Sequence, residues 1–511
     1  MNEKCSQLLK RVINKNYSNI RLDNLSYNDD EFYYEFKSDE QVSENDFEKL
    51  EKEIRKLDNS VYVKLIRVSG VYFEGDSNNE MITRIVGKGF NSEEEVEKYN
   101  EFLKEAKERD HRKIGQDLDL FCFSDYVGSG LPLYTPRGTI VIDELKKEME
   151  RICKKYGFQK VSCPSLADIS LFETSGHARK FNDELFRVSS PKGHEFALKP
   201  VQCPHHTQIY ASKLRSYKDL PIRYMESDKQ YRAELQGAVG NSLARTYAFT
   251  VEDGHIFCTR NQVKDEIIHI CKLIEEFYSN MGLWNNYWVS LSLKDYDHPE
   301  KYIGDSEDWD LCEKLLEEIS NELHLDAKRC EGEAALYGPK LDFMFKDALG
   351  REIQIPTIQL DFATPKRFGL FYIDENGEKQ TPVMVHRAVL GSYERFLVLL
   401  LEQFKGVLPL WLSPVQVNII PINIKYHDEY CKKLKELLLD EDIRVEYDNS
   451  EERFNKKLMN STKMKNPYTI IIGDNERDNN LVSYRKYGSE DTFSVNIDEF
   501  INLIKDEIRN K

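Results

Sequence analysis

The stretch from Lys199 to His255 constrains the fold more than any other part of the chain. It contains a predicted strand around IRYME, a segment QGAVGNS with the Gly, Asn and Ser typical of a loop, and a second predicted strand around YAFTVE. Arg232 and Glu234 are two residues apart, so on a strand both point to one face, and Arg245 would lie on the partner strand. Arginine binds phosphate and carboxylate through paired hydrogen bonds, so such a hairpin would suit a nucleotide triphosphate. An ordinary hairpin with surface salt bridges is the commoner arrangement of the same residue types.

Candidate metal ligands occur within this stretch and far beyond it. Cys203 and His255 belong to the stretch, and His386 lies downstream in VMVHRAVLGSYERF. Thiolate and imidazole suit zinc, and three protein ligands leave a fourth position for water or substrate. The spacing matches no compact zinc finger, and single Cys or His residues more often lie in the core or on the surface. The trio is therefore one hypothesis, with His205 and His206 as alternative ligands.

Composition limits the class of protein. The 511 residues leave room for two to four domains. A net charge of −17 argues against nucleic-acid binding through the whole surface but is compatible with a local basic path. Ten cysteines without paired spacing predict no disulfide framework and a reducing cytoplasm. No signal peptide and no run of about 18 apolar residues occurs, so we expect no membrane association.

Helix-like and strand-like patterns divide the chain. Residues 1–90 contain an amphipathic helix capped by Ser43, and residues 91–115 predict one long charged helix with Glu–Lys pairs. Residues 116–410 combine strands with amphipathic helices. Residues 411–511 alternate strand and helix, which predicts a mixed, largely parallel sheet.

Several motifs resemble those of class II aminoacyl-tRNA synthetases, and most closely those of the threonyl-tRNA synthetase family. The stretch described above resembles the second signature motif of that class. Residues 156–177, with Pro164, resemble the first motif, and VMVHRAVLGSYERF resembles the third. LYGPKLDF and IQLDFATPKRF resemble active-site strands. The resemblance extends from about residue 60 to the C-terminus.

The resemblance implies an α+β fold. Residues 116–410 would form the class II catalytic domain, an antiparallel sheet with flanking helices, and 411–511 an α/β anticodon-binding domain. Residues 1–90 would be a truncated remnant of the editing domain, followed by a linker helix at 91–115. Editing uses histidines and a cysteine, yet residues 1–110 contain no histidine and only Cys5, near a terminus expected to be mobile. Candidate RNA contacts in the last domain are Lys456, Lys457, Lys463, Lys465, Arg485 and Lys486.

The resemblance also implies roles for individual residues. It implies one zinc ion per chain, held by Cys203, His255 and His386. It implies that the catalytic residues are Arg232, Arg245 and Arg395. These arginines would bind ATP together with Glu234 and Gln354, with Mg²⁺ between the phosphates. It implies a threonine site that includes Asp253, Tyr337, Lys340, Thr357 and Gln359.

The implied activity is ATP-dependent attachment of threonine to tRNA(Thr) through a threonyl-adenylate, by a homodimer that does not hydrolyse seryl-tRNA. The sequence departs from the family pattern at several positions near the expected pocket, so substrate affinity or identity could differ. These positions are Gln202, His205, Ala233, Val251 and Gly254. Two alternatives follow: an amino-acid-activating paralogue with another substrate or acceptor, and a non-catalytic tRNA-binding regulator.

Overall fold

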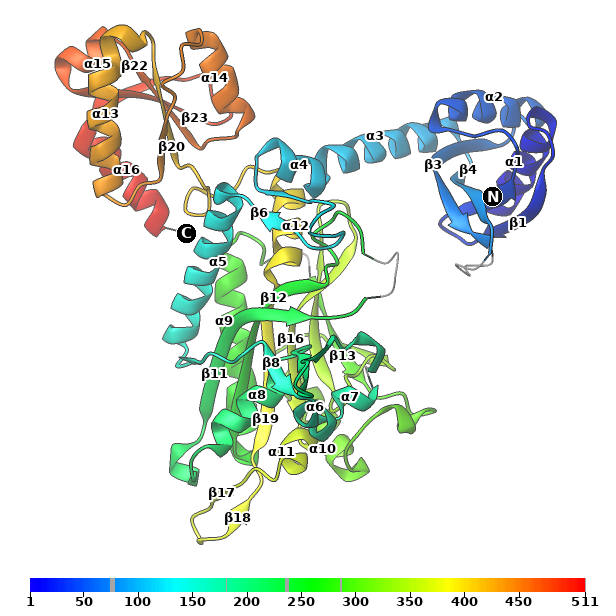
Figure 1. Cartoon of the computed structure of the whole chain (residues 1–511), viewed down its shortest axis with the longest axis vertical. Coiled ribbons are helices and arrows are strands. Elements are labelled where there is room, and N and C mark those ends of the chain that lie inside the picture. The colour runs from blue at the N-terminus through cyan, green and yellow to red at the C-terminus, as the bar shows by residue number, and fades with distance from the viewer. Residues whose placement is uncertain (74–78, 181, 235–238, 285–286, 511) are drawn as a thin grey trace. The chain divides into compact units, whose positions relative to one another are not determined.

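The chain divides into two compact units, Met1–Glu108 and Arg109–Lys511. A computed structural model describes residues 1–73, 79–180, 182–234, 239–284 and 287–510 (Figure 1). Among these residues, no helix combines the length and the apolar character needed to cross a lipid bilayer.

The N-terminal unit is a four-stranded antiparallel sheet packed against two helices. The sheet order is β1 (Arg21–Tyr27), β2 (Phe32–Lys37), β4 (Met81–Phe90) and β3 (Tyr62–Tyr72). The helices are α1 (Asn2–Asn16) and α2 (Phe47–Leu57). Phe32, Tyr34 and Phe36 alternate along β2 and are fully buried in the same core as the apolar residues of both helices. The unit therefore has a hydrophobic core of its own.

Two local predictions for this unit have different outcomes. Ser43 caps the short 3₁₀ turn Glu44–Asp46 that leads into α2, rather than α2 itself, and its backbone N–H donates to the Asp46 carboxylate at 2.9 Å. The expectation that Cys5 lies on a mobile terminus is wrong. Cys5 is fully buried, and a Cβ atom on Gly89 would lie 2.5 Å from its Sγ. Burial raises the pKa of this thiol to about 11.

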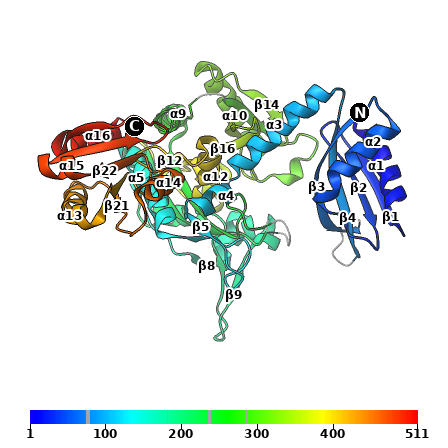
Figure 2. The same cartoon turned by 90° about the horizontal axis from the view of Figure 1, so that it is seen from above.

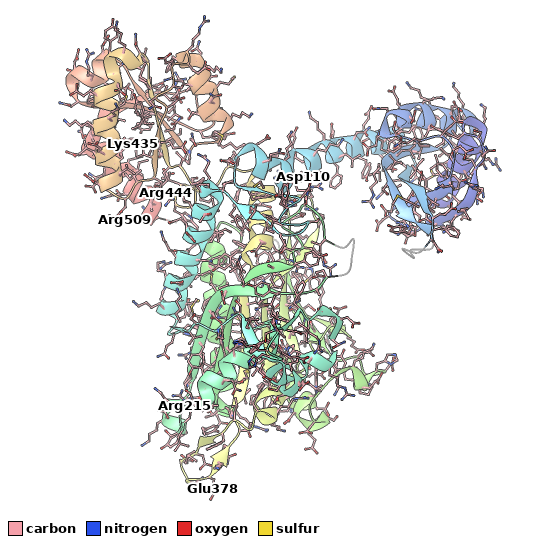
Figure 3. All side chains as sticks on the ribbon, viewed as in Figure 1. Asp110, Arg215, Glu378, Lys435, Arg444 and Arg509 are labelled. Atoms are coloured by element: carbon pink, nitrogen blue, oxygen red, sulfur yellow. The ribbon has the colours of Figure 1, made fainter. Side chains whose placement is uncertain are left out.

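The charged segment after this sheet forms two helices rather than the single predicted one. They are α3 (Glu93–Arg109) and α4 (His111–Asp117). Asp110, labelled in Figure 3, interrupts the helical path and caps α4 by accepting a hydrogen bond from the Arg112 backbone N–H at 2.9 Å.

An eight-stranded, mainly antiparallel sheet organises the larger unit. Its order is β14 (Lys328–Glu331), β13 (Tyr287–Leu293), β15 (Lys340–Lys346), β16 (Glu352–Asp361), β19 (Val383–Ser392), β12 (Ala248–Cys258), β11 (Ile222–Tyr231) and β7 (Gln159–Lys160). Its core is shared with α5 (Pro136–Lys155), α9 (Val263–Asn280), α10 (Ser306–Glu322) and α12 (Tyr393–Phe404). The predicted antiparallel sheet with flanking helices is confirmed.

Smaller elements surround this sheet. A three-stranded sheet consists of β8 (Leu166–Asp168), β10 (Glu195–Leu198) and β9 (Arg187–Ser189), and Figure 2 shows β8 and β9 extending away from the main sheet. The two-stranded pairs are β5 (Phe121–Cys122) with β6 (Leu133–Tyr134), and β17 (Tyr372–Ile373) with β18 (Lys379–Gln380). Short helices are α6 (Ile169–Ser175), α7 (His177–Lys180), α8 (Cys203–Ala211) and α11 (Ala363–Arg367).

The register of the central strands aligns the predicted site residues in rows across one face. His255 on β12 lies opposite His386 on β19, which lies opposite Gln359 on β16. Lys340 on β15 continues this row. A second row, two residues along each strand, consists of Asp253, Ala388, Thr357 and Asp342. Because side chains alternate with a period of two, both rows face the same side of the sheet.

The last part of the chain is a five-stranded sheet with helices. The order is β21 (Val445–Tyr447), β20 (Val417–Pro421), β22 (Tyr468–Ile472), β23 (Leu481–Lys486) and β24 (Phe493–Asn496). The helices are α13 (Ile424–Asp440), α14 (Phe454–Lys463), α15 (Asp474–Asn479) and α16 (Ile497–Arg509). The sheet is mixed, as predicted, but only β20 pairs in parallel, with β21 and β22, whereas β23 and β24 are antiparallel.

One candidate RNA contact in this part is excluded by burial. The Lys457 side chain is 2% exposed, and its Nζ donates to the Asp448 carbonyl at 2.9 Å. Lys457 therefore anchors the chain after β21 and cannot reach a phosphate backbone.

Candidate active site

A cavity of about 690 Å³ lies over the central strands of the main sheet. Its walls come from the segment between β11 and β12, from β12, β16 and β19, and from the start of α12. Seven of the predicted site residues line it: Arg232, Glu234, Arg245, Asp253, Gln354, Thr357 and Arg395.

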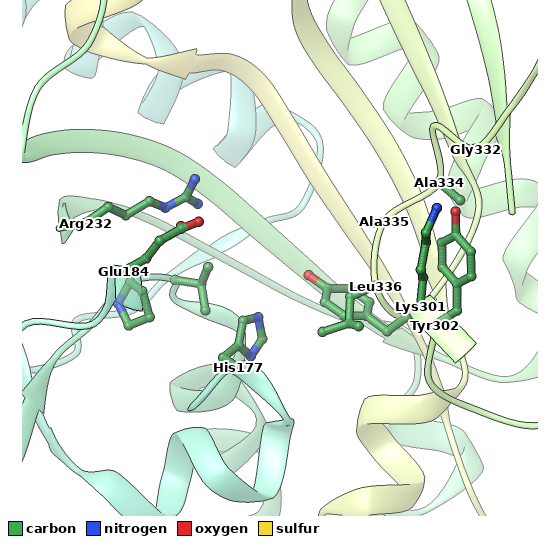
Figure 4. A pocket seen from close by; sticks show the side chains of 12 residues that line it. His177, Glu184, Arg232, Lys301, Tyr302, Gly332, Ala334, Ala335 and Leu336 are labelled. Carbon is green, nitrogen blue, oxygen red and sulfur yellow. The ribbon is translucent and has the colours of Figure 1, made fainter. Parts of the chain in front are cut away.

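A second cavity, of about 410 Å³, adjoins the first, because Arg232 and Val201 line both. Tyr337, another predicted site residue, lines this second cavity. Figure 4 shows Arg232 and Glu184 on one side of it and Lys301 on the opposite side. The two cavities therefore share part of their walls, at Arg232 and Val201.

The arginines come from a loop rather than from the paired strands that the sequence predicted. β11 ends at Tyr231 and β12 begins at Ala248, so Arg232, Glu234 and Arg245 all lie between the strands. Of the predicted loop QGAVGNS, residues 236–238 lie outside the described residues. The strand ends because the Ala233 backbone N–H donates to the Glu184 carbonyl at 2.8 Å, away from the β12 ladder.

Three guanidinium groups, those of Arg232, Arg245 and Arg395, line the larger cavity. The Arg395 Nε donates to the Ala244 carbonyl at 2.9 Å. Burial lowers the pKa of Arg395, and the positive charges of Arg232 and Arg245 lower it further. Glu234 is an acidic partner within the cavity wall and lies 2.8 Å from an Arg245 nitrogen. A concentration of positive charge of this kind is suited to a polyphosphate anion.

Sequence reasoning missed Asp342, which holds several of the predicted residues in place. This carboxylate is 2% exposed and accepts hydrogen bonds from Gln354 Nε2, Thr357 Oγ1 and Ser292 Oγ, each at 2.7 Å. The Lys340 ammonium lies 2.9 Å away. A signal was present, since Asp342 is an acidic residue between the apolar Leu341 and Phe343 of a predicted strand.

The three predicted metal ligands come together, although none of them lines either cavity. Cys203 begins α8, His255 lies on β12 and His386 on β19, and all three are buried. Their ligand atoms lie within 4.8 Å of one another. Among the described residues, the Nε2 atom of His255 is buried and has no hydrogen-bond partner. Because buried polar atoms are normally paired, and a thiol with two imidazoles suits zinc, these residues fit a zinc ion.

Burial controls the ionisation of this group. It raises the pKa of the Cys203 thiol well above its usual range and lowers that of His255 well below its usual range. Burial likewise raises the pKa of Asp253 to about 7. A thiol in this environment becomes a thiolate only when a cation binds beside it.

The remaining predicted residues lie around the trio. The Tyr337 ring centroid is 4.9 Å from that of His386, and Gln359 is the strand partner of His386. The Asp361 carboxylate, which sequence reasoning also missed, lies 2.9 Å from His386 Nε2.

The departures from the family pattern do not all face the pocket. Val251 lines the larger cavity, whereas Gln202 and His205 are buried at the start of α8 and line neither of the two cavities. Gly254 points to the opposite side of the sheet. A Cβ atom there would lie 2.5 Å from Arg387 Nε, and Arg387 forms a fully buried pair with Glu252. Gly254 therefore affects the packing of that ion pair.

Comparison with known proteins agrees with this geometry. The tRNA synthetase class II core domain (G, H, P, S and T) matches residues 186–404, and the anticodon-binding domain matches residues 416–507. Over 448 residues the chain is 39% identical to the threonine–tRNA ligase of Oceanobacillus iheyensis. This alignment covers 88% of this chain and 69% of that protein. It is 42% identical over 450 residues to the enzyme of the same name from Ureaplasma parvum serovar 3, covering 88% of this chain and 77% of that protein.

A solved structure supports the same relationship. The RNA binding domain of threonyl-tRNA synthetase from Cryptosporidium parvum Iowa II superimposes with a TM-score of 0.73 at 32% identity. The match covers 78% of this chain and 98% of that one. The fold thus combines a class II synthetase catalytic core with an anticodon-binding domain. From its motifs, its sheet and its relatives, the chain belongs to the threonine–tRNA ligase family of class II aminoacyl-tRNA synthetases.

Proposed function

We propose that this protein attaches threonine to tRNA(Thr) in the cytoplasm, through a threonyl-adenylate. One observation supports this above all: three arginines line a cavity whose wall includes Asp253, and Asp253 lies 3.8 Å from His255 of the buried Cys–His–His group. The names of the relatives supply the amino acid and the acceptor. All ten cysteines are free, which suits a reducing compartment.

ATP would occupy the larger cavity. Arg232 would contact the α-phosphate and the amino-acid carboxylate, and Arg245 and Arg395 would hold the outer phosphates together with Mg²⁺. Glu234 would face the adenine and also orient Arg245, its partner at 2.8 Å, while Gln354 would contact the ribose. Catalysis would consist of positioning the carboxylate for attack on the α-phosphorus and stabilising the charge that develops on the phosphate.

Threonine would bind next to the buried trio. Cys203, His255 and His386 would hold zinc, which when bound would coordinate the amine and hydroxyl of threonine and so discriminate against valine. Asp253 lies 3.8 Å from His255 Nε2, close enough to accept a hydrogen bond from the threonine side chain. Tyr337, Lys340, Thr357 and Gln359 would complete the pocket.

We assign the parts of the chain accordingly. Residues 116–410 would activate threonine and residues 411–511 would bind the anticodon, with homodimer formation near Pro164. Residues 1–90 would be a remnant of the editing domain and 91–115 a linker. The absence of histidine from residues 1–110 and the burial of Cys5 support the absence of an editing site from this part of the chain.

Aminoacylation is the decisive experiment. Threonine-dependent pyrophosphate exchange together with charging of tRNA(Thr) is the expected result. Exchange without charging would favour a paralogue with another acceptor, a possibility raised by Val251 in the cavity wall. Absence of both activities would favour a tRNA-binding regulator.

The metal assignment has a separate test. We expect about one zinc per chain in the wild-type protein, measured by elemental analysis, and its loss in Cys203→Ala. Undiminished zinc in that variant would contradict the assignment.

A further inference from the structure

A second buried polar row lies behind the proposed zinc ligands. His206 on α8 and Glu226 on β11 are 0% and 3% exposed, respectively. The Nδ1 atom of His206 lies 2.7 Å from the Nδ1 atom of His255. Its Nε2 atom lies 3.4 Å from Glu226 Oε2. We call His255, His206 and Glu226 the relay.

At the Glu226 end of the relay, the neighbours of the carboxylate determine which atoms donate and which accept. Glu226 Oε1 accepts a hydrogen bond from the Cys163 backbone N–H, and the Lys199 ammonium lies 3.8 Å from Oε2. At 3.4 Å, the contact between Oε2 and His206 Nε2 is longer than an ideal hydrogen bond. Both atoms are nevertheless buried, and neither has another hydrogen-bond partner in the described part of the chain. Since buried polar atoms are normally paired, we pair them with each other.

Proton positions then follow along the relay. A carboxylate only accepts, so the Nε2 atom of His206 carries hydrogen. In a neutral imidazole, Nδ1 is then the acceptor, and the short contact requires His255 to carry its hydrogen on Nδ1. The Nε2 atom of His255, which has no partner among the described residues, is left with a lone pair. At the other histidine ligand, Asp361 lies 2.9 Å from His386 Nε2 and leaves Nδ1 as the free atom.

We propose that His206 and Glu226 are positioning residues, which hold His255 in the tautomer that presents Nε2 to the zinc ion. This inference rests on the proposed zinc site. Histidine ligands generally donate their second N–H to a fixed acceptor, and loss of that acceptor typically weakens metal binding by about 10–100-fold. Here the acceptor is itself a histidine, oriented in turn by a carboxylate.

A second metal ion is the competing explanation of the same residues. Cys163, His206 and Glu226 also bring their ligand atoms within 4.8 Å of one another. The fully buried Lys199 argues against a cation there, because its ammonium already lies 3.8 Å from Glu226 and 2.6 Å from Asp228. The relay explains the contacts of His206 and Glu226 without placing a further positive charge beside the Lys199 ammonium.

The test is the zinc affinity of the full-length protein, stripped of metal and titrated with zinc against a chromophoric chelator. In His206→Asn, the new amide oxygen would lie near the former Nδ1 position, so this variant should bind zinc with nearly wild-type affinity. His206→Leu has no acceptor and should bind about 10–100-fold more weakly. Likewise, Glu226→Gln keeps an acceptor and should bind zinc more tightly than Glu226→Leu.

His205→Leu is the matched control, because His205 is the adjacent buried histidine and both of its ring nitrogens are unpaired among the described residues. It should retain zinc affinity. Thermal unfolding of each metal-free variant separates loss of folding from loss of affinity.

Three results would overturn the relay: unchanged affinity in His206→Leu, equal weakening in the Asn and Leu variants, or two zinc ions per wild-type chain. A wild-type protein that binds no zinc would remove the proposed zinc site as well, so the two failures are distinguishable.

Discussion

At the scale of single residues, Arg395 provides the sharpest test of the proposed ATP site. Its guanidinium lines the larger cavity while its Nε is held by the Ala244 carbonyl. Arg395→Lys keeps the charge but removes the planar fork that binds phosphate through two parallel bonds. We expect threonine-dependent pyrophosphate exchange to fall by roughly 100-fold. Arg215→Lys, at an arginine that lines neither of the two cavities, is the matched control. Near-normal exchange by Arg395→Lys would rule out the phosphate-binding role.

The residue types alone predicted some of the site residues and missed others. Arginines near a glutamate indicated an anion pocket from chemistry alone. Cys203, His255 and His386 were one hypothesis from ligand chemistry, and only the family resemblance singled them out. Residues this far apart are brought together by the register of β12 and β19 and by the position of α8, which sequence spacing does not show. Asp342 and Asp361 could have been noticed as charges within apolar strands. His206 was weighed only as an alternative ligand, since no sequence pattern shows which imidazole nitrogen faces which neighbour.

At the scale of elements, the start of α12 should make stability depend on pH. Glu394 accepts from the Thr250 backbone N–H at 3.0 and 2.9 Å, and burial raises its pKa to about 7. The fold therefore favours the protonated acid, whereas the unfolded chain releases the proton near pH 4.3. The stabilisation is complete below that pH and is lost as the pH rises through about 7.

Glu394→Gln should remove this dependence. Relative to the variant, the wild type should lose about 2 kcal/mol of unfolding free energy between roughly pH 5.5 and pH 8.5. Denaturant unfolding at both pH values measures the difference, with Glu375→Gln as an exposed control. Equal pH dependence in wild type and Glu394→Gln would show that this carboxyl is already ionised in the fold.

Element types were easier to predict than element ends. The main strands were predicted from alternating or apolar runs, because a strand that buries every second residue shows this period directly in its sequence. The break at Asp110 was missed, since the surrounding Glu–Lys pairs favour an uninterrupted helix. The positions of Arg232 and Arg245 were missed because a backbone bond to distant Glu184 ends the strand. Whether neighbouring strands of the last sheet run parallel or antiparallel also depends on pairing between distant segments, which the local sequence pattern does not encode.

At the scale of the whole molecule, we expect a homodimer through the region that resembles the first class II motif. Pro164 is exposed, and Leu166 on β8, an edge strand, is 42% exposed. Light scattering at micromolar concentration should give about 120 kDa, twice the 60.0 kDa of one chain. Leu166→Arg should shift the mass towards that of a monomer, while Leu214→Arg, at another exposed leucine, should not. A monomeric wild type would contradict the assignment of this interface.

Fidelity is also a property of the whole chain. Serine offers zinc the same amine and hydroxyl as threonine, and the missing methyl is worth only about 1–3 kcal/mol of discrimination. Hydrolysis of the wrong product would need a second site, but residues 1–110 contain no histidine and their single cysteine is buried in the N-terminal core with a raised thiol pKa. We therefore expect the protein to form seryl-tRNA(Thr) at a measurable rate and not to deacylate it. The measurement is release of serine from preformed seryl-tRNA(Thr) without ATP, with buffer alone as the control. Rapid release that requires the protein would reveal a hydrolytic site elsewhere in the chain.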